Sequence, residues 1–133
     1  MVLRKLRVAL LVTAIATVAV AGLGGPAQAA NYNGKCESGE VCLYWVGNYY
    51  GGVADFYHDI YNYKSFRFKG SGAGVGQSLN DNSASARNRA RYAHAILCTD
   101  SYFGGDCMEM DPGDAYPDLG PFNNELSSHF FFG

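Results

Sequence analysis

Residues 44–52 read YWVGNYYGG and residues 97–105 read LCTDSYFGG, so the chain contains one pattern twice. Each segment starts with strand-forming residues, passes through a polar turn and ends on two aromatic residues followed by Gly-Gly. An Asn-rich turn ending in serine follows each segment, at residues 80–85 (NDNSAS) and at residues 123–128 (NNELSS). Because one supersecondary unit recurs in the same order, the pattern predicts an all-β domain made of two similar units.

The aromatic and glycine residues of each repeat are expected to form the corner of a hairpin. Gly51 and Gly104 suit positions that need a positive φ. Tyr49 and Tyr102 stand two residues before these glycines, where a ring can cover the bare backbone. We interpret residues 89–99 as the strand that links the two units.

The N-terminal residues have the three regions of an export signal. Arg4, Lys5 and Arg7 form a positive segment, residues 8–21 are apolar apart from two threonines, and residues 27–29 (AQA) form a small-x-small cleavage site. We therefore predict a signal peptide at 1–29 and a secreted domain at 30–133, with units at about 36–89 and 90–133. No membrane association is expected after cleavage.

The predicted secreted domain is acidic. Three of the ten basic residues lie in the signal peptide, so seven Lys and Arg remain against twelve Asp and Glu, a net charge of about −5. Phosphate contacts need clustered positive charge, so this balance disfavours a nucleic-acid partner. A single, monomeric domain is expected at this length, and its small core needs reinforcement.

The four cysteines provide that reinforcement in an exported chain. Four cysteines allow three connectivities, and the sequence alone does not choose among them. The short, glycine-containing loops make Cys36–Cys42 and Cys98–Cys107 our first choice. A zinc site built on these cysteines is disfavoured, because the three histidines are scattered and no C-x-x-C pair occurs.

The pattern Tyr44-x4-Tyr49-x-Gly51, with a downstream Asn-rich turn ending in serine, resembles the βγ-crystallin Greek-key signature. With the signal peptide and the cysteines at 36, 42, 98 and 107, the chain more closely resembles the secreted actinobacterial peptidase inhibitors of family I36. The resemblance implies a small βγ-crystallin-like sandwich of two disulfide-stapled Greek-key units. In this comparison Leu97 stands where the first unit has Tyr44.

The resemblance also implies a function, the inhibition of a secreted protease, with zinc metalloproteases as the first target class. The bond that such a protease engages would be Cys98–Thr99, followed by Asp100 and pinned by Cys107. This loop is longer than the family inhibitor's loop, and Thr99 and Asp100 replace the apolar residue that a thermolysin-like enzyme prefers. With the Cys98–Thr99 bond as the one engaged, the resemblance implies that Cys98, Thr99 and Asp100 are the inhibitory residues.

A calcium-binding role is the alternative that the crystallin resemblance implies. Amide, carboxylate and hydroxyl oxygens form the ligand set that Ca²⁺ prefers. The second turn matches the binding pattern fully, whereas the first has Ala84 where a hydroxyl is expected. The candidate ligands are Asn80, Asp81, Asn123, Asn124 and Ser127; no other cofactor is implied.

The many aromatic residues suggest a further alternative, a platform that stacks on the sugars of a cell-wall glycan. Its candidate residues are Trp45, Tyr49, Tyr50, Tyr57, Tyr61 and Tyr63. Residues 130–132 (FFF) predict a last strand with two rings inward and one outward. The carboxylates and histidines show no recognisable catalytic arrangement, so we expect a binding or inhibitory protein and no enzyme.

Overall fold

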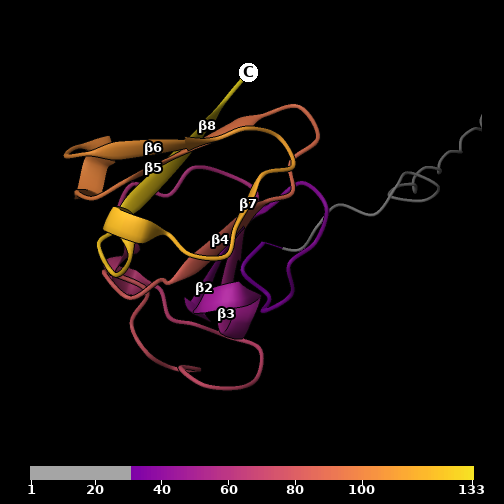
Figure 1. The fold of residues 1–133 in the computed structure, drawn as a ribbon, viewed down its shortest axis with the longest axis vertical. Helices are drawn as coiled ribbons and strands as arrows, with labels where there is room; N and C mark the ends of the chain where they lie inside the picture. Colours follow the sequence, from indigo (N-terminus) through magenta and orange to yellow (C-terminus); the bar gives the residue numbers. More distant parts are fainter. Residues whose placement is uncertain (1–30) are drawn as a thin grey trace, which may run out of the picture.

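The computed structural model describes residues 31–133, so the predicted signal peptide and its cleavage site lie outside the described part (Figure 1). The strands are β2 (Val41–Val46), β3 (Tyr50–Phe56), β4 (Ser85–Asn88), β5 (His94–Cys98), β6 (Cys107–Met110), β7 (Ala115–Tyr116) and β8 (Ser128–Phe132). Short 3₁₀ turns connect them: η2 (Gly47–Tyr49), η3 (Tyr63–Ser65), η4 (Ser101–Phe103) and η5 (Gly120–Phe122). Within residues 31–133, no helix has the length and apolar character needed to cross a membrane.

The strands form two antiparallel sheets, which confirms the predicted all-β fold (Figure 1). One sheet has the order β3-β2-β4-β7 and the other has the order β6-β5-β8. The halves of the chain exchange segments, because β7 of the second half joins the first sheet and Ile60 of the first half pairs with His129 of β8. The two units are therefore interlocked and do not sit side by side as separate lobes.

The core lies between the inner faces of the two sheets. Strand alternation directs Leu43 of β2 and Leu97 of β5 inward, where both are fully buried. The other large, fully buried apolar side chains of this cluster are Val41, Phe56, Tyr63, Phe68, Leu79, Met110 and Leu126. Burial of apolar area of this kind is the main favourable term in the stability of such a sandwich.

The C-terminal strand β8 differs from its prediction. Phe131 packs against the core, whereas Phe130 packs on Phe103 and Phe132 packs on His94, with 47% of Phe132 exposed. Side chains alternate along a strand, so residues 130 and 132 share one face. One ring therefore faces inward and two face outward; the expected count was the reverse.

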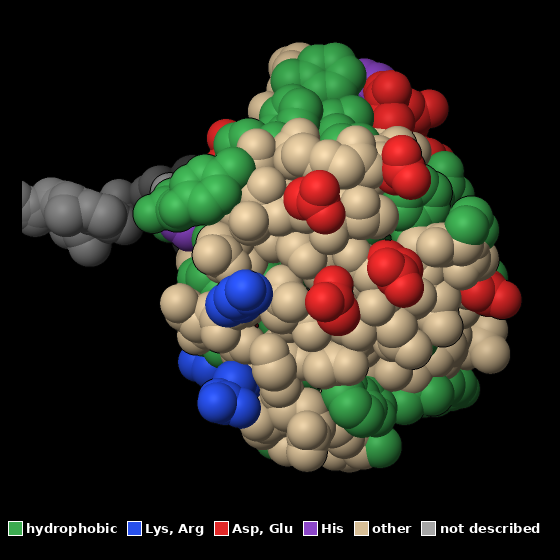
Figure 2. All heavy atoms as spheres, turned by 90° about the vertical axis from the view of Figure 1, so that its left-hand side faces the viewer, with side chains coloured by type: hydrophobic (Ala, Val, Ile, Leu, Met, Phe, Trp, Pro, Cys, Tyr) green, Lys and Arg blue, Asp and Glu red, His purple; other side chains and the backbone are tan. Residues whose placement is uncertain are grey.

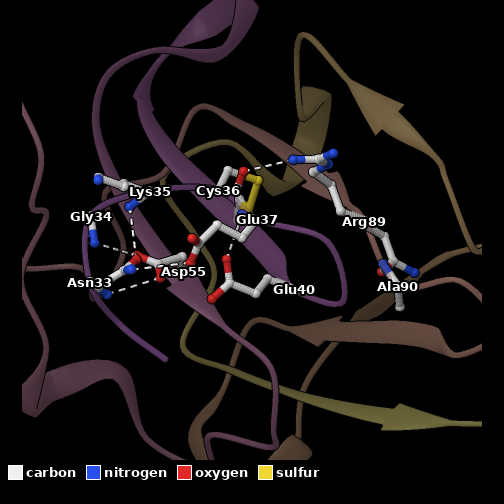
Figure 3. Close-up of a disulfide and its surroundings, with 11 residues drawn as sticks. Asn33, Gly34, Lys35, Cys36, Glu37, Glu40, Asp55, Arg89 and Ala90 are labelled. Atoms are coloured by element: carbon white, nitrogen blue, oxygen red, sulfur yellow. Dashed lines mark hydrogen bonds between the residues drawn. A yellow bond between two sulfur atoms is a disulfide. The ribbon is translucent and has the colours of Figure 1, made fainter. Parts of the chain in front are cut away.

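The N-terminal disulfide, Cys36–Cys42, lies beside two buried carboxyl groups (Figure 3). Asp55 accepts the backbone N–H groups of Asn33 (3.0 Å) and Gly34 (2.7 Å). Glu40 is fully buried; its Oε1 accepts the N–H of Glu37 at 2.6 Å, and its Oε2 has no partner. Burial, reinforced by the charge of Asp55, raises the pKa of Glu40 from 4.5 to about 7.

This shift predicts how stability depends on pH. The folded protein binds the Glu40 proton more tightly than the unfolded chain, so the free energy of unfolding should fall as pH rises from about 4.5 to about 7. In Glu40→Gln the amide keeps the acceptor for Glu37 and cannot ionise. The variant should lose this pH dependence and melt on the order of 5 °C above the wild type at pH 8. Thermal melts from pH 4 to pH 8 measure this, with the exposed Glu125→Gln as control.

Candidate functional site

Two buried serines show how the repeats correspond. Ser85 Oγ donates to the carbonyl of Val46 (2.7 Å) and accepts the N–H of Tyr49 (3.0 Å). Ser128 Oγ makes the same pair of bonds in the second unit, to the carbonyl of Asp100 (2.6 Å) and from the N–H of Phe103 (3.1 Å). Phe103 is therefore the counterpart of Tyr49.

This correspondence corrects the predicted corner of the second unit by one residue. Gly105 (φ 76°) matches Gly51 (φ 79°), and the predicted corner residues Tyr102 and Gly104 each lie one position too early. The sequence comparison placed Gly104-Gly105 opposite Gly51-Gly52 because both are Gly-Gly pairs. In the structure Gly104 corresponds to Tyr50, and Gly105 corresponds to Gly51. An added Cβ on Gly105 would lie 2.3 Å from Thr99 Oγ1, so both space and φ require glycine there.

The second disulfide occupies the place that an aromatic corner takes in the first unit. Tyr44 pairs with Val53 across β2 and β3, and its ring meets that of Tyr49 edge to face at 5.8 Å. In the second unit the equivalent pair is Cys98 and Cys107, joined as a disulfide with a Cα–Cα distance of 4.1 Å. Both disulfides thus follow the local pairing expected from the sequence. Cys98, and not Leu97, stands at the position of Tyr44.

The disulfide closes the hairpin between β5 and β6, and the peptide bond between Cys98 and Thr99 has its carbonyl and its N–H hydrogen-bonded within the protein. Cys98 is fully buried and its carbonyl accepts the N–H of Ser127 (2.8 Å). The N–H of Thr99 donates to the carbonyl of Asp106 (2.9 Å), and Thr99 Oγ1 accepts the N–H of Asp106 (3.0 Å). Asp100 is exposed. The residues that face solvent at this end therefore belong to the turn 100–106.

This hairpin turn, residues 100–106, presents aromatic side chains. Tyr102 is 69% exposed and stacks on Tyr61, which is 57% exposed, with ring centroids 5.1 Å apart. The N–H of Tyr102 donates to the carbonyl of Tyr61 (2.6 Å), which ties the turn to the first unit. Figure 2 shows this side of the molecule, where acidic side chains are spread over the surface, hydrophobic side chains lie mainly toward the edges of the view and basic side chains gather at one side. The turn is thus a rigid, partly apolar projection on an acidic face.

The predicted calcium ligands separate into two places, each made from both halves of the chain. Ser127 Oγ donates to Asp81 Oδ1 (3.2 Å), and Asn80 Oδ1 is buried without a partner. A pocket surrounds them, lined by Lys64, Asn80, Asp81, Thr99, Asp100, Ser101 and Ser127. Amide, carboxylate and hydroxyl oxygens, which could act as metal ligands, therefore line this pocket together with Lys64.

The other place combines Asn123 and Asn124 with the first Asn-rich turn. The N–H of Asn124 donates to the carbonyl of Ser83, just as the N–H of Asp81 donates to the carbonyl of Leu126. By this symmetry Ala84, next to Asn124, is the counterpart of Ser127, next to Asp81. Ala84 has no hydroxyl to offer as a ligand. Amide, carboxylate and hydroxyl oxygens come together only where Asn80 and Asp81 of the first Asn-rich turn lie beside Ser127 of the second. The second turn matches the calcium-binding pattern in sequence, but its own residues do not form one ligand set.

Two of the aromatic candidates for glycan binding, Tyr63 and Trp45, are not open to a ligand at the surface. Tyr63 is fully buried and hydrogen-bonds through its hydroxyl to His129 Nδ1 (2.7 Å). Burial lowers the pKa of His129 to about 4, so this histidine is neutral at pH 7. Trp45 packs edge to face on Phe68 at 5.6 Å, and a Cβ added to Gly74 would lie 2.1 Å from its ring, so the glycine-rich loop covers the tryptophan.

Known structures share this fold. A structure from work on the evolution of the eye-lens βγ-crystallin domain fold is 21% identical over 80% of this chain and 93% of its own, with a TM-score of 0.60. A βγ-crystallin from an archaeon is 20% identical over 72% of this chain and 100% of its own, with a TM-score of 0.53. Spherulin 3a from Physarum polycephalum is 24% identical over 74% of this chain and 87% of its own, with a TM-score of 0.53. No curated protein matches the sequence.

The interlocked sheets, the serine-tied corners and these likenesses define a βγ-crystallin-type Greek-key domain with two disulfides. The chain belongs to peptidase inhibitor family I36, whose model matches residues 28–110. Membership supports the role of peptidase inhibitor and a non-catalytic protein. With two disulfides, it also favours an oxidising, extracellular location.

The serine bonds predict a stability effect at the hairpin turn. Ser128→Ala removes a buried hydroxyl that satisfies two backbone groups, so the free energy of unfolding should fall by about 1–3 kcal/mol. Urea denaturation measures this change. Ser71→Ala, at an exposed position, should change stability by no more than about 0.5 kcal/mol. Equal, small effects in both variants would contradict the role given to Ser128.

Proposed function

We propose that this protein inhibits a secreted protease through its hairpin turn, residues 100–106. The observation that carries the proposal is the exposed Tyr102 on a turn closed by the Cys98–Cys107 disulfide. A turn held by a disulfide, by Ser128 and by the backbone of Tyr61 loses little conformational entropy on binding. Exposed tyrosine is also among the residue types that dominate binding energy at protein interfaces.

The proposal assigns Cys98 and Thr99 a supporting role. Their peptide bond is hydrogen-bonded on both sides, through its carbonyl to the N–H of Ser127 and through its N–H to the carbonyl of Asp106, so a protease could cleave it only after this part of the fold opened. The protease contact would instead be made by Asp100 and the residues that follow it. Two exposed aspartates, Asp100 and Asp106, favour a protease with basic groups around its cleft. A metalloprotease remains the first class to test, and we expect the inhibitor to act as a monomer.

A protease panel tests this proposal. The secreted domain should inhibit one or more metallo-, serine or cysteine proteases at near-stoichiometric amounts. Tyr102→Ala should raise the inhibition constant at least about 30-fold, because loss of an interface anchor costs about 2 kcal/mol or more. Tyr92→Ala is the matched control, since Tyr92 is 78% exposed and lies outside the turn.

Two results would count against the proposal. One is no inhibition of any protease in the panel by a correctly folded, disulfide-bonded protein. The other is equal inhibition by the wild type and Tyr102→Ala, which would move the contact away from the turn. Melting curves for each variant separate loss of contact from loss of fold.

A second candidate function is calcium binding at the pocket around Asn80, Asp81 and Ser127. The observation that favours it is the buried Asn80 Oδ1, which has no hydrogen-bond partner. Amide, carboxylate and hydroxyl oxygens suit a hard dication, and a bound ion would satisfy this orphaned acceptor. Lys64 lines the same pocket and opposes a cation, so we expect weak binding, with a dissociation constant of about 10⁻⁴–10⁻³ M.

Calcium binding at this pocket predicts a ligand-dependent melt. The melting temperature should rise with millimolar CaCl₂ in the wild type. Ser127→Ala should abolish the rise because it removes the hydroxyl ligand, whereas Asn123→Ala, in the place that lacks a hydroxyl, should keep it. Differential scanning calorimetry in CaCl₂ and in EDTA measures both. A melt unchanged by calcium in the wild type would exclude the site.

A further inference from the structure

The outer face of the second sheet brings one histidine and two carboxylates together. Ala95 pairs with Met110, and both side chains are fully buried, so their neighbours point away from the core. His94 of β5 therefore lies opposite Asp111 and diagonally across from Glu109 of β6. Side chains in these relations on one face of an antiparallel pair are within reach of each other.

The two carboxylates approach the same nitrogen of the histidine, His94 Nδ1. His94 Nδ1 lies 2.7 Å from Glu109 Oε2 and 3.0 Å from Asp111 Oδ1, and the three ligand atoms lie within 4.8 Å of one another. An imidazole nitrogen carries at most one hydrogen, so it cannot donate a full hydrogen bond to both carboxylates. A dication could bind the nitrogen lone pair and both carboxylates at once, and it would also offset their mutual repulsion.

A buried asparagine positions the backbone on both sides of this group. Asn88 is 1% exposed and comes from β4 of the other sheet. Its side-chain nitrogen lies within hydrogen-bond distance of three carbonyl oxygens, those of Ala93 (3.0 Å), Met110 (3.0 Å) and Asp111 (3.2 Å), and its two hydrogens are shared among them. The residues next to His94 and the backbone of Asp111 are thus held by one side chain, which lowers the cost of bringing the ligands together.

Aromatic packing holds the histidine ring itself. The ring of Phe132 stacks on His94 with a centroid distance of 4.9 Å and an interplanar angle of 17°. The surroundings are also negative, because a third carboxylate, that of Asp114, accepts the backbone N–H of Asp111 at 2.8 Å. The group therefore combines a positioned imidazole with a local field that attracts cations.

We propose that His94, Glu109 and Asp111 form a binding site for a divalent transition metal of the Zn²⁺ class. One imidazole nitrogen and two carboxylate oxygens are a ligand set that Zn²⁺ accepts, with water in the remaining positions. Donors about 2.1 Å from such an ion are about 3.0–3.4 Å apart, so the side chains need only small shifts to bind it. The imidazole makes Ca²⁺ and Mg²⁺ poorer occupants, because they prefer oxygen ligands alone.

This metal site lies at the opposite end of β5 from the inhibitory turn. His94 begins the strand and Cys98 ends it, which places the two about 13 Å apart along the strand. The disulfide closes the hairpin at its turn, and the metal would close it at its open end. The metal proposal does not depend on protease inhibition, since a bound ion there leaves residues 100–106 exposed.

Titration with the metal alone tests the site. The secreted domain, treated with a chelator and dialysed, should bind one Zn²⁺ per chain by isothermal titration calorimetry, and its melting temperature should rise with Zn²⁺. Substitution by Co²⁺ should give visible absorption from a nitrogen- and oxygen-ligated ion. His94→Gln and Asp111→Asn should each weaken Zn²⁺ binding at least about tenfold. His58→Gln, at an exposed histidine elsewhere, should bind Zn²⁺ as the wild type does.

Three outcomes would overturn the proposal. They are no saturable binding of Zn²⁺ to the folded wild type, unchanged binding in both His94→Gln and Asp111→Asn, or loss of binding in His58→Gln alone. Asp111→Asn keeps the size of the side chain, so it preserves a test of the site if His94→Gln fails to fold. A change in the metal-free melting temperature without any effect of Zn²⁺ would show that the three groups have only a structural role.

Discussion

A buried serine hydroxyl ties the folded corner of each unit, and the rest of the structure depends on this bond pair. Ser128 binds the carbonyl before the 3₁₀ turn η4 and the N–H at its end, as Ser85 does for η2. The turn is thereby held although Tyr102 and Phe103 both have positive φ, an unfavourable state for residues with a side chain. The corner in turn fixes the register that sets Cys98 opposite Cys107 and directs Tyr102 to solvent.

The exchange of segments between the halves makes the oxygen-lined pocket a joint product of both. Asp81 comes from the first Asn-rich turn and Ser127 from the second, and each turn's backbone donates to the other turn. One missing hydroxyl, at Ala84, therefore impairs the place built around Asn124 and leaves the place around Asp81 complete. The two places therefore offer different sets of oxygen groups.

The hairpin of β5 and β6 carries two separate surfaces because strand alternation and strand ends divide it. Its turn projects aromatic side chains from a disulfide-closed loop, which suits a rigid contact with a protease. Its open end presents His94 and the two carboxylates on the outer face, held through Asn88 by the other sheet. The same β5 strand thus positions both surfaces while its inward residues, Ala95 and Leu97, contribute to the core.

The sequence by itself determined the duplicated all-β fold and favoured the local pairing of cysteines, because strand propensity, turn residues and short loops act between residues close in the chain; the structure then showed that pairing. It placed the second corner one residue early, since two Gly-Gly pairs look equivalent until Ser128 shows which carbonyl and N–H it binds. Only the tertiary structure buried Tyr63 against His129 and joined Asp81 to Ser127. Likewise, His94 meets Glu109 and Asp111 only through the register of β5 and β6, and register depends on packing between residues far apart in the chain.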